Sequence, residues 1–194
     1  MEEGDVIVVD TGCAVAWTLQ GFRFKKEQRI LHAFNNTPMG YALPAAVGVA
    51  CALEERRRVI CVVGDGSLMM NIQELATVQH QKLPIKIFLV NNNGYAMVQQ
   101  TQEQWLDGNY FATSHEGGLS FPDFSMLAQS FDMPYRSIEN NSEIDRHIKE
   151  TLNELGPAFC DVKISRKQRV QPQSKFGRPI EDAEPLLPRK EFLD

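Results

Sequence analysis

Short apolar runs alternate with segments of helical periodicity along most of this 194-residue chain. The runs at 59–63 and 85–90 are rich in β-branched residues and are bounded by turn residues. Such runs are typical of parallel strands that are buried on both faces of a sheet. The stretch between them has apolar residues at helical spacing, namely Leu68, Ile72, Leu75 and Val78. The pattern therefore predicts a strand–helix–strand unit with a right-handed crossover.

The same alternation continues on both sides of this unit. Further strands are predicted at 6–10, 29–34, 135–138 and 158–164, and helices from residue 13, over 41–53, and from residues 95, 122 and 142. We expect Ser142 to N-cap the last of these helices. About six strands with helices between them predict an α/β fold, a doubly wound and mostly parallel sheet.

Two segments lack such periodicity. The segment 102–121 predicts a long functional loop, either a lid over a site or a solvated insertion. From residue 166 onward, prolines and charges of both signs interrupt any pattern. We therefore expect one domain over 1–165 and a Pro-rich tail over 166–194 that packs on a neighbouring domain or subunit.

Composition narrows the class of protein. The formal net charge is −5, and Lys and Arg cluster only in the mixed-sign run 54–58, which we interpret as a solvated cap rather than a nucleic-acid site. No signal peptide and no apolar run of membrane-spanning length is present, so we expect no membrane association. The four cysteines show no C-x-x-C spacing and are interpreted as reduced core residues of a cytoplasmic protein: Cys13, Cys51, Cys61 and Cys160.

Polar residues follow both strands of the central unit. Asp65 comes after the first strand and Asn92 after the second. Because the carboxyl ends of parallel strands share one edge of a sheet, we expect these residues to lie a few ångströms apart. A carboxylate, an amide oxygen and the main-chain carbonyl of Gly94 would supply three hard oxygen ligands, which suits octahedral Mg²⁺.

The residues around Asp65 suit a bound anion. Gly64 and Gly66 allow a ligand to approach the main chain closely, and Gly66 and Ser67 open a helix whose N–H groups favour phosphate. A metal ion beside such N–H groups indicates a diphosphate site. Either G-D-G or N-N-N-G alone could be an ordinary turn, but their pairing at the ends of neighbouring strands favours a site.

Gly64-Asp65-Gly66-Ser67, followed at this distance by Asn91-Asn92, resembles the motif of enzymes that use thiamine diphosphate (ThDP). The segments 70–77 and 83–86 resemble more narrowly the C-terminal, diphosphate-binding domain of the acetohydroxyacid (acetolactate) synthase branch. The resemblance covers roughly residues 5–165 and implies ThDP and Mg²⁺ as cofactors, with Asp65, Asn92 and Gly94 as metal ligands. It implies cofactor contacts from Cys13, Ala14, Thr37, Met39, Gly64, Asp65, Gly66, Ser67, Asn92, Gly94, Tyr95, Ala96 and Met97.

The resemblance also implies catalytic roles for Met39 and Thr37. In the family, a large apolar residue at the Met39 position wedges under the cofactor, and the carbonyl at the Thr37 position accepts a bond from its 4′-amino group. From the residues alone, Met39 is an apolar residue at a loop–helix junction, where methionine is usually a gap filler. The family often has a Gln-His pair where this chain has Cys13 and Ala14, a departure that weakens the case for the standard reaction.

The function that the resemblance implies is decarboxylation of a 2-keto acid, followed by ligation to a second carbonyl compound, by a lyase or transferase. The family needs a pyrimidine-binding (PYR) domain, which we expect on another chain or in a missing N-terminal part. Alone, the chain should be inactive, and it should form homo- or hetero-oligomers. An alternative hypothesis is a non-catalytic binding or scaffolding module. A nucleotide-binding Rossmann domain is disfavoured, because no G-x-G-x-x-G follows the first strand.

Overall fold

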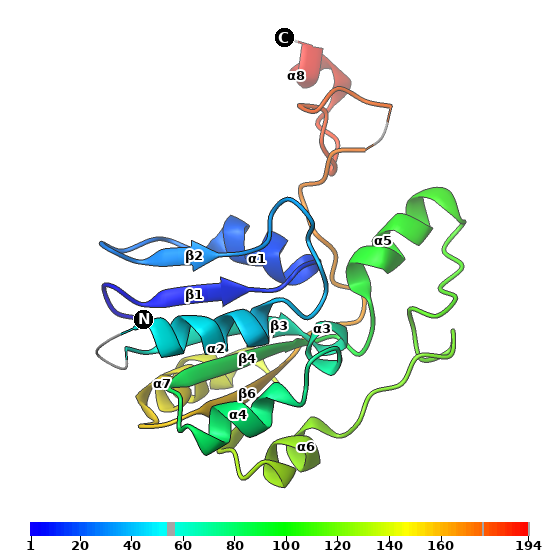
Figure 1. Cartoon of the computed structure of the whole chain (residues 1–194). Coiled ribbons are helices and arrows are strands. Elements are labelled where there is room, and N and C mark those ends of the chain that lie inside the picture. Colours follow the sequence, from blue (N-terminus) through cyan, green and yellow to red (C-terminus); the bar gives the residue numbers. More distant parts are fainter. Residues whose placement is uncertain (54–56, 176, 194) are drawn as a thin grey trace.

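The computed structural model describes residues 1–53, 57–175 and 177–193, so part of the mixed-sign run 54–58 lies outside the described residues. Helices and strands alternate along the chain (Figure 1). The strands are β1 (Val6–Val9), β2 (Arg29–Leu31), β3 (Val59–Gly64), β4 (Ile85–Asn91), β5 (Tyr135–Ile138) and β6 (Ala158–Lys163). The helices are α1 (Cys13–Gly21), α2 (Ala42–Ala52), α3 (Asp65–Met69), α4 (Glu74–His80), α5 (Ala96–Trp105), α6 (Phe124–Ser130), α7 (Ile144–Asn153) and α8 (Arg189–Leu193), with a 3₁₀ turn, η1 (Asn141–Glu143).

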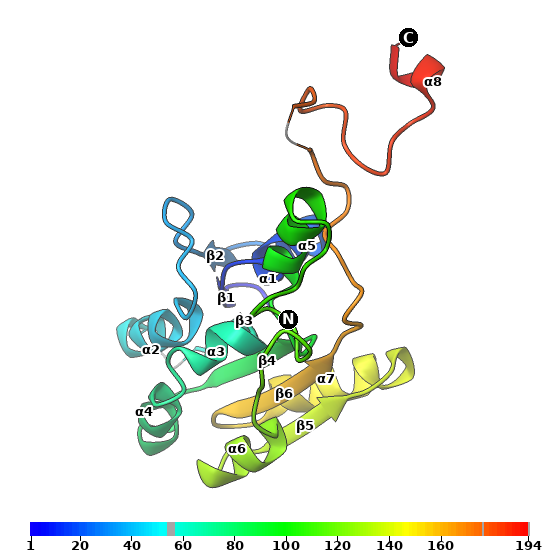
Figure 2. The same cartoon turned by 90° about the vertical axis from the view of Figure 1, so that its right-hand side faces the viewer.

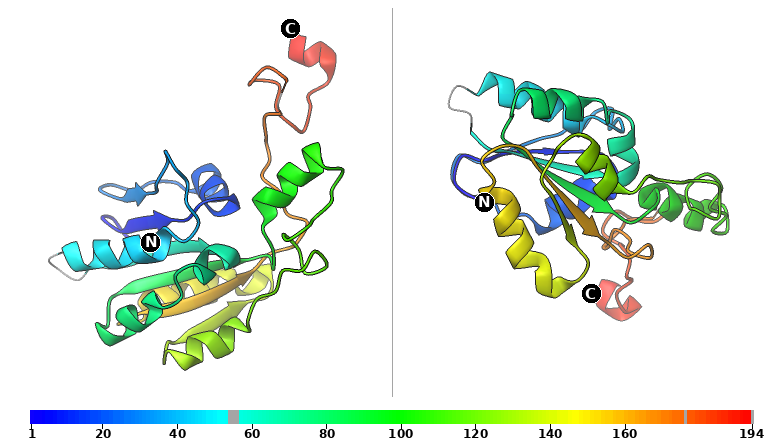
Figure 3. Two further views of the ribbon diagram at one scale, coloured as in Figure 1. Left: turned by 45° about the vertical axis from the view of Figure 1, so that its right-hand side comes forward. Right: turned by 90° about the horizontal axis from the view of Figure 1, so that it is seen from below.

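Within the described residues, six strands form one parallel sheet in the order β2-β1-β3-β4-β6-β5. Helices α2, α4 and α6 cover one face, and α1 and α7 cover the other (Figure 3). The predicted doubly wound α/β fold is therefore confirmed. The chain runs outward from β1 to β2 and then returns to place β3 on the other side of β1. Such a reversal is a topological switch point, where open α/β sheets bind ligands.

The core follows from the alternation of side chains along each strand. Val8 and Cys61 pack under α2, whereas Ile7, Val9 and Ile60 pack on the face of α1 and α7. Successive strand residues point to opposite faces, so strands covered on both sides must be apolar throughout. This requirement explains the unbroken apolar runs in the sequence.

The single helix predicted across residues 68–78 is two helices. It is interrupted between α3 and α4, where the side-chain amide of Asn71 donates a 2.7 Å hydrogen bond to the carbonyl oxygen of Gly40. Leu75 and Val78 are still fully buried in the core, so the periodicity correctly indicated the buried face. The break arises from a contact with the segment before α2, which local periodicity does not reveal.

Two smaller expectations were wrong. Ser142 was expected to cap the helix, but a 3₁₀ turn, η1, precedes α7. The side chain of Asn140 caps that turn by accepting a hydrogen bond from Ser142 N. Cys51 is exposed because it lies off the face of α2 that buries Leu43, Ala46 and Ala50, whereas the other three cysteines are buried. All four are free thiols.

Helix α5 and the tail extend away from the carboxyl edge of the sheet (Figure 2). Helix α5 continues to Trp105, four residues into the segment predicted as a loop, and irregular chain follows as far as α6. The first tail residues cross α1 and α5, and the remainder projects from the body with α8 at its far end (Figure 1). None of the helices in the described part of the chain is long and apolar enough to cross a membrane.

Candidate functional site

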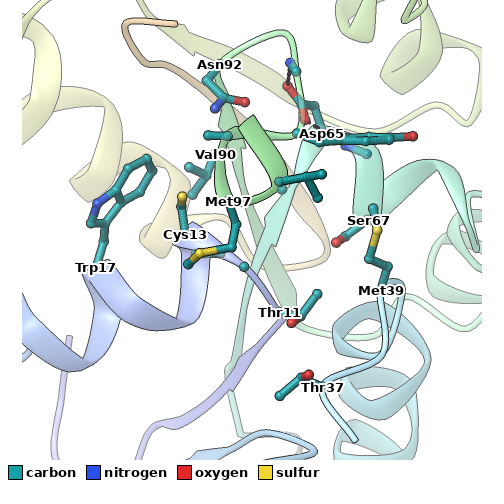
Figure 4. A pocket seen from close by; sticks show the side chains of 18 residues that line it. Thr11, Cys13, Trp17, Thr37, Met39, Asp65, Ser67, Val90, Asn92 and Met97 are labelled. Carbon is teal, nitrogen blue, oxygen red and sulfur yellow. Dashed lines mark hydrogen bonds between the residues drawn. The ribbon is translucent and has the colours of Figure 1, made fainter. Parts of the chain in front are cut away.

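A cavity of about 270 Å³ opens at the carboxyl edge of the sheet, beside the ends of β1, β3 and β4. It lies at the switch point between β1 and β3. All thirteen residues that the sequence predicted as cofactor contacts line this cavity: Cys13, Ala14, Thr37, Met39, Gly64, Asp65, Gly66, Ser67, Asn92, Gly94, Tyr95, Ala96 and Met97. Figure 4 shows that they come from segments far apart in the sequence.

Three oxygen atoms converge beside β3 and β4. The side-chain oxygen Oδ1 of Asn92 lies 2.7 Å from the carbonyl oxygen of Gly94 and 3.2 Å from Oδ2 of Asp65. Turning the Asn92 amide over would place its Nδ2 donor at the same distances. The cluster therefore needs either that rotation or a cation, because oxygen acceptors this close repel one another.

These oxygens match the donor set of a hard divalent cation. The described residues include no group of three or more His, Cys, Asp or Glu side chains that could hold a metal ion. The donor set here is instead one carboxylate, one amide oxygen and one main-chain carbonyl, all of them suited to Mg²⁺ or Ca²⁺. A single carboxylate leaves such a divalent ion with a net charge of about +1, which would attract an anion.

Asp65 is held in a demanding environment. It is almost fully buried, and burial raises the pKa of its carboxyl to about 6, although hydrogen bonds from main-chain N–H groups oppose the shift. Gly66 N donates to Oδ1 at 2.7 Å and Gly94 N donates to Oδ2 at 3.2 Å. The same carboxylate thus fixes the start of α3 and the loop after β4, and a bound cation would favour its charged form.

The two glycines beside Asp65 have different reasons to be glycine. A Cβ on Gly66 would lie 2.1 Å from Cε1 of Tyr95 and 3.2 Å from Cε of Met39, so only glycine fits against these side chains. A Cβ on Gly64 would meet no atom within 4 Å. Since Gly64 lines the cavity, its missing side chain leaves open volume in which a ligand can lie against the main chain.

Thr37 and Met39 form the wall opposite Asn92. Thr37 has a positive φ of 42°, in the left-handed region, and lies at the turn that follows β2. Met39 is 38% exposed, and Figure 4 shows its side chain extending from that connection toward Ser67. An apolar side chain in such a position offers a flat, uncharged surface to the body of a ligand.

The third wall is apolar and neutral. Cys13 and Ala96 are buried together with Val170 from the tail, and Trp17 and Met97 pack against them. Burial raises the pKa of the Cys13 thiol to about 11, with Arg169 opposing the shift, so the thiol is protonated near neutral pH. Cys13 and Ala14 therefore contribute shape, and any bonds to an anion from this turn come from main-chain N–H groups.

Some cavity residues were missed by the sequence analysis. Thr11, Gly12 and Trp17 belong to the turn and helix after β1, Val90 lies near the end of β4, and Val98 lies in α5. Position after a strand end was the available signal for Thr11 and Gly12. Trp17 and Val98 look like ordinary helix residues in the sequence. The tail residue Val170, which backs the Cys13 wall, had no sequence signal at all.

Comparison with known proteins shows which family this chain resembles. Residues 10–162 match the family model described as "Thiamine pyrophosphate enzyme, C-terminal TPP binding domain". The chain is 33% identical over 177 residues to the acetolactate synthase isozyme 1 large subunit of Escherichia coli K12, which covers 91% of this chain and 31% of the relative. It is 34% identical over 173 residues to the acetolactate synthase large subunit of Parasynechococcus marenigrum WH8102, covering 89% and 27%. The chain thus spans about three tenths of the length of the first relative and slightly less of the second.

Proposed function

Because the chain belongs to the thiamine pyrophosphate enzymes, as their C-terminal TPP-binding domain, we propose that its cavity holds the diphosphate of ThDP through Mg²⁺. The observation that carries the proposal is the convergence of oxygen atoms from Asp65, Asn92 and Gly94. Octahedral Mg²⁺ with bonds of about 2.1 Å places neighbouring ligand oxygens about 3 Å apart. The separations of 2.7 and 3.2 Å lie on either side of that value.

The remaining cavity residues fit the other parts of the cofactor. Main-chain N–H groups beside the open face of Gly64 and Ser67 would bind diphosphate oxygens. Met39 would support the body of the cofactor from below, and the Thr37 carbonyl would accept a hydrogen bond from its amino group. When bound, ThDP supplies a nucleophilic carbon and an electron sink. The apolar wall of Cys13, Ala96 and Met97 would keep water away from that carbon.

The reaction would be that of an acetolactate synthase-like decarboxylase or carboligase acting on a 2-keto acid. The relatives are about three times longer than this chain, so the rest of such an enzyme would come from other domains or chains. Within the cavity, no carboxylate other than that of Asp65 is among the lining residues. We therefore assign proton transfer to a PYR domain, expected on a partner chain or in a missing N-terminal part, and expect the chain alone to be inactive.

Two further parts of the proposal are association with other domains or chains and the cellular compartment. The Pro-rich segment 166–194 would reach a neighbouring domain or subunit with its projecting part, in a homo- or hetero-oligomer. The free thiols fit a reducing compartment, the cytoplasm.

A second candidate function is a non-catalytic binding or scaffolding module. One observation favours it: Cys13 and Ala14 offer no charged or strongly polar group to the ligand, and the thiol is held neutral. The counter-argument is the position of Asp65, Asn92 and Gly94 together at the cavity, where their oxygens are placed to hold a metal ion when the Asn92 oxygen faces them.

Native mass spectrometry tests the proposal on the chain purified gently from its source, with Mg²⁺ and ThDP present. A complex with an unlike chain that retains ThDP and turns over a 2-keto acid would support the split-enzyme reading. A complex with an unlike chain that retains ThDP but does not turn over a 2-keto acid would favour the binding module. A folded chain that binds neither Mg²⁺–pyrophosphate nor ThDP in titration calorimetry would overturn both. Asp65→Asn serves as the matched control, since it removes one ligand charge at constant size.

A further inference from the structure

One buried carboxylate outside the oxygen cluster joins two walls of the cavity. Asp10 follows β1 and is fully buried. Its Oδ1 accepts hydrogen bonds from Thr11 N at 2.9 Å and from Gly40 N at 3.1 Å, and its Oδ2 accepts one from Ala42 N at 2.7 Å. Thr11 starts the turn into α1, whereas Gly40 and Ala42 lead into α2. The carboxylate therefore fixes the two turns relative to each other.

Gly40 is also held from the opposite side. Its carbonyl oxygen accepts the 2.7 Å bond from Nδ2 of Asn71, just after α3. Its φ is +84°, and a Cβ there would lie 2.6 Å from the Cβ of Met70. Both polar groups of Gly40 are thus bonded, one to the end of β1 and one to the segment after α3. The residue immediately before this doubly held glycine is Met39.

Met39 depends on these bonds because little else confines it. The residue is 38% exposed, and its Cε would lie 3.2 Å from a Cβ added to Gly66. A side chain this open is positioned mainly by its main chain. A change in the bonds at Gly40 should therefore shift the Met39 side chain relative to Gly66.

We propose that Asp10 is a positioning residue, whose carboxylate sets the height of Met39 over Gly66 and so shapes the surface that supports the body of the cofactor. The inference rests on the proposed function for its meaning in catalysis, but the positioning itself is a property of the free chain. An asparagine at this place would keep one acceptor and turn an N–H₂ donor toward a main-chain N–H. The bonds to Gly40 and Ala42 could then not both be made.

A simpler role for Asp10 would be to cap the start of α2. Such a cap would contribute to stability and would not act through Met39. The two roles are separated by observing Met39 directly and by measuring whether the effects of changes at residues 10 and 39 depend on each other.

The first experiment is methyl NMR of the ligand-free chain with labelled methionines. The Met39 methyl group and the Tyr95 ring both approach Gly66, so the ring should shift the Met39 signal in the wild-type chain. Asp10→Asn should move this signal toward that of an exposed methionine, leaving buried Met133 and exposed Met126 unchanged. Asp10→Ser gives the same test if the asparagine variant does not fold. An unmoved Met39 signal in a folded variant would overturn the proposal.

Asp5→Asn is the matched control. Asp5 is also a buried aspartate at an end of β1, but at the opposite end, where it pairs with Arg58 at 2.7 Å. Its substitution should lower stability without changing the Met39 signal. A Met39 shift of equal size in this control would show a general loss of packing and would overturn the specific role of Asp10.

The second experiment is calorimetry with two probes, Mg²⁺–ThDP and Mg²⁺–pyrophosphate. Asp10→Asn should weaken ThDP binding about tenfold, the loss of roughly one charge-assisted hydrogen bond, and change pyrophosphate binding less than about twofold. In a Met39→Ala background, Asp10→Asn should change ThDP binding less than about twofold. Equal losses for both probes, or an undiminished loss in that background, would contradict the proposal. A wild-type chain that binds neither probe, with the NMR shift still present, would overturn the proposed function and leave the positioning role standing.

Discussion

The amide oxygen of Asn92 faces Oδ2 of Asp65 at 3.2 Å, across the gap between the ends of β4 and β3. Neither oxygen carries a proton when Asp65 is charged, so this contact is unfavourable unless a cation lies beside it or the amide turns over. The Gly94 carbonyl completes the cluster. Asp65 is the charged member of these three groups, so its carboxylate would supply the attraction for a cation.

Asp65→Asn should weaken Mg²⁺-dependent ThDP binding more than about 100-fold. Loss of a residue that binds the metal directly should exceed the usual effect of changing a residue that only contacts such a ligand. Without Mg²⁺ the free energy of unfolding should change by less than about 1–3 kcal/mol, because losing one of the bonds from Gly66 N and Gly94 N opposes the gain from removing a carboxylate whose charge burial disfavours. Titration calorimetry and urea unfolding measure the two effects. Asp123→Asn, which alters an exposed cap of α6, should leave binding intact. Mg²⁺-dependent binding that survives in Asp65→Asn would refute the metal site.

Gly66→Ala should destabilise the fold by about 1–3 kcal/mol, because its Cβ would lie 2.1 Å from the Tyr95 ring. Gly48→Ala is the control: a Cβ there meets nothing within 4 Å, and alanine in mid-helix should stabilise by about 0.5–1 kcal/mol. Adding Tyr95→Ala to Gly66→Ala should recover part of the loss. Urea unfolding checks all three, and equal effects of the two glycine substitutions would refute the close contact.

Lys86 gives the fold a specific pH dependence. It is buried at the amino end of the sheet, where its Nζ donates to the carbonyl oxygens of Glu154 and Gly156. Burial lowers its pKa from 10.5 to about 8, with Glu154 opposing the shift and Arg58 and Arg136 adding to it. Between these two values the unfolded chain keeps a proton that the folded chain has lost, so this group makes stability rise with pH.

Lys86→Met should remove that dependence. Relative to the variant, the wild-type chain should gain roughly 2 kcal/mol of unfolding free energy between about pH 7.5 and pH 10. Urea unfolding at the two pH values measures the difference, and groups that titrate alike in both chains cancel. Parallel stability curves for wild type and variant would contradict the assignment.

Gln100 should control the docking of the tail. Its side chain accepts a bond from Val170 N at 3.1 Å and donates one to Val170 O at 2.9 Å. Gln100→Ala leaves both groups unbonded at a cost of about 1–3 kcal/mol, so trypsin should cut at 166–169 at least about fivefold faster. Thr101→Ala, on the exposed side of α5, should leave the cleavage rate unchanged. Equal rates for Gln100→Ala and wild type would mean that the tail is held elsewhere.

The sheet and the oxygen cluster were accessible from sequence because both depend on local pattern plus one rule of topology. Apolar runs mark buried strands, and residues after neighbouring parallel strands must meet at one edge. This rule was enough to predict that Asp65 and Asn92 lie close together. The strand order was not accessible, since it depends on packing among helices that look alike in sequence.

Contacts between distant segments explain most of what the sequence analysis missed. Asn71 breaks a helix because it bonds to Gly40, and Asp10 joins two turns that only the fold brings together. Buried glutamines were equally hidden, because Gln99 and Gln102 bond to the 111–113 segment of the loop after α5. A polar residue in a helix normally predicts exposure, and only the position of the loop and tail reverses that expectation.

The strand order determines at which stage of unfolding the oxygen cluster is lost. Local unfolding of a domain begins at the margins of its sheet, where strands have one neighbour, and reaches the centre last. Here β2 and β5 are the marginal strands, whereas Asp65 and Asn92 follow β3 and β4 in the middle. Transient opening of either margin therefore leaves the spacing of the oxygen cluster intact. We therefore expect the amide hydrogens of β3 and β4 to exchange only when the whole domain unfolds. The oxygen cluster should be lost in the same event, with the free energy of global unfolding.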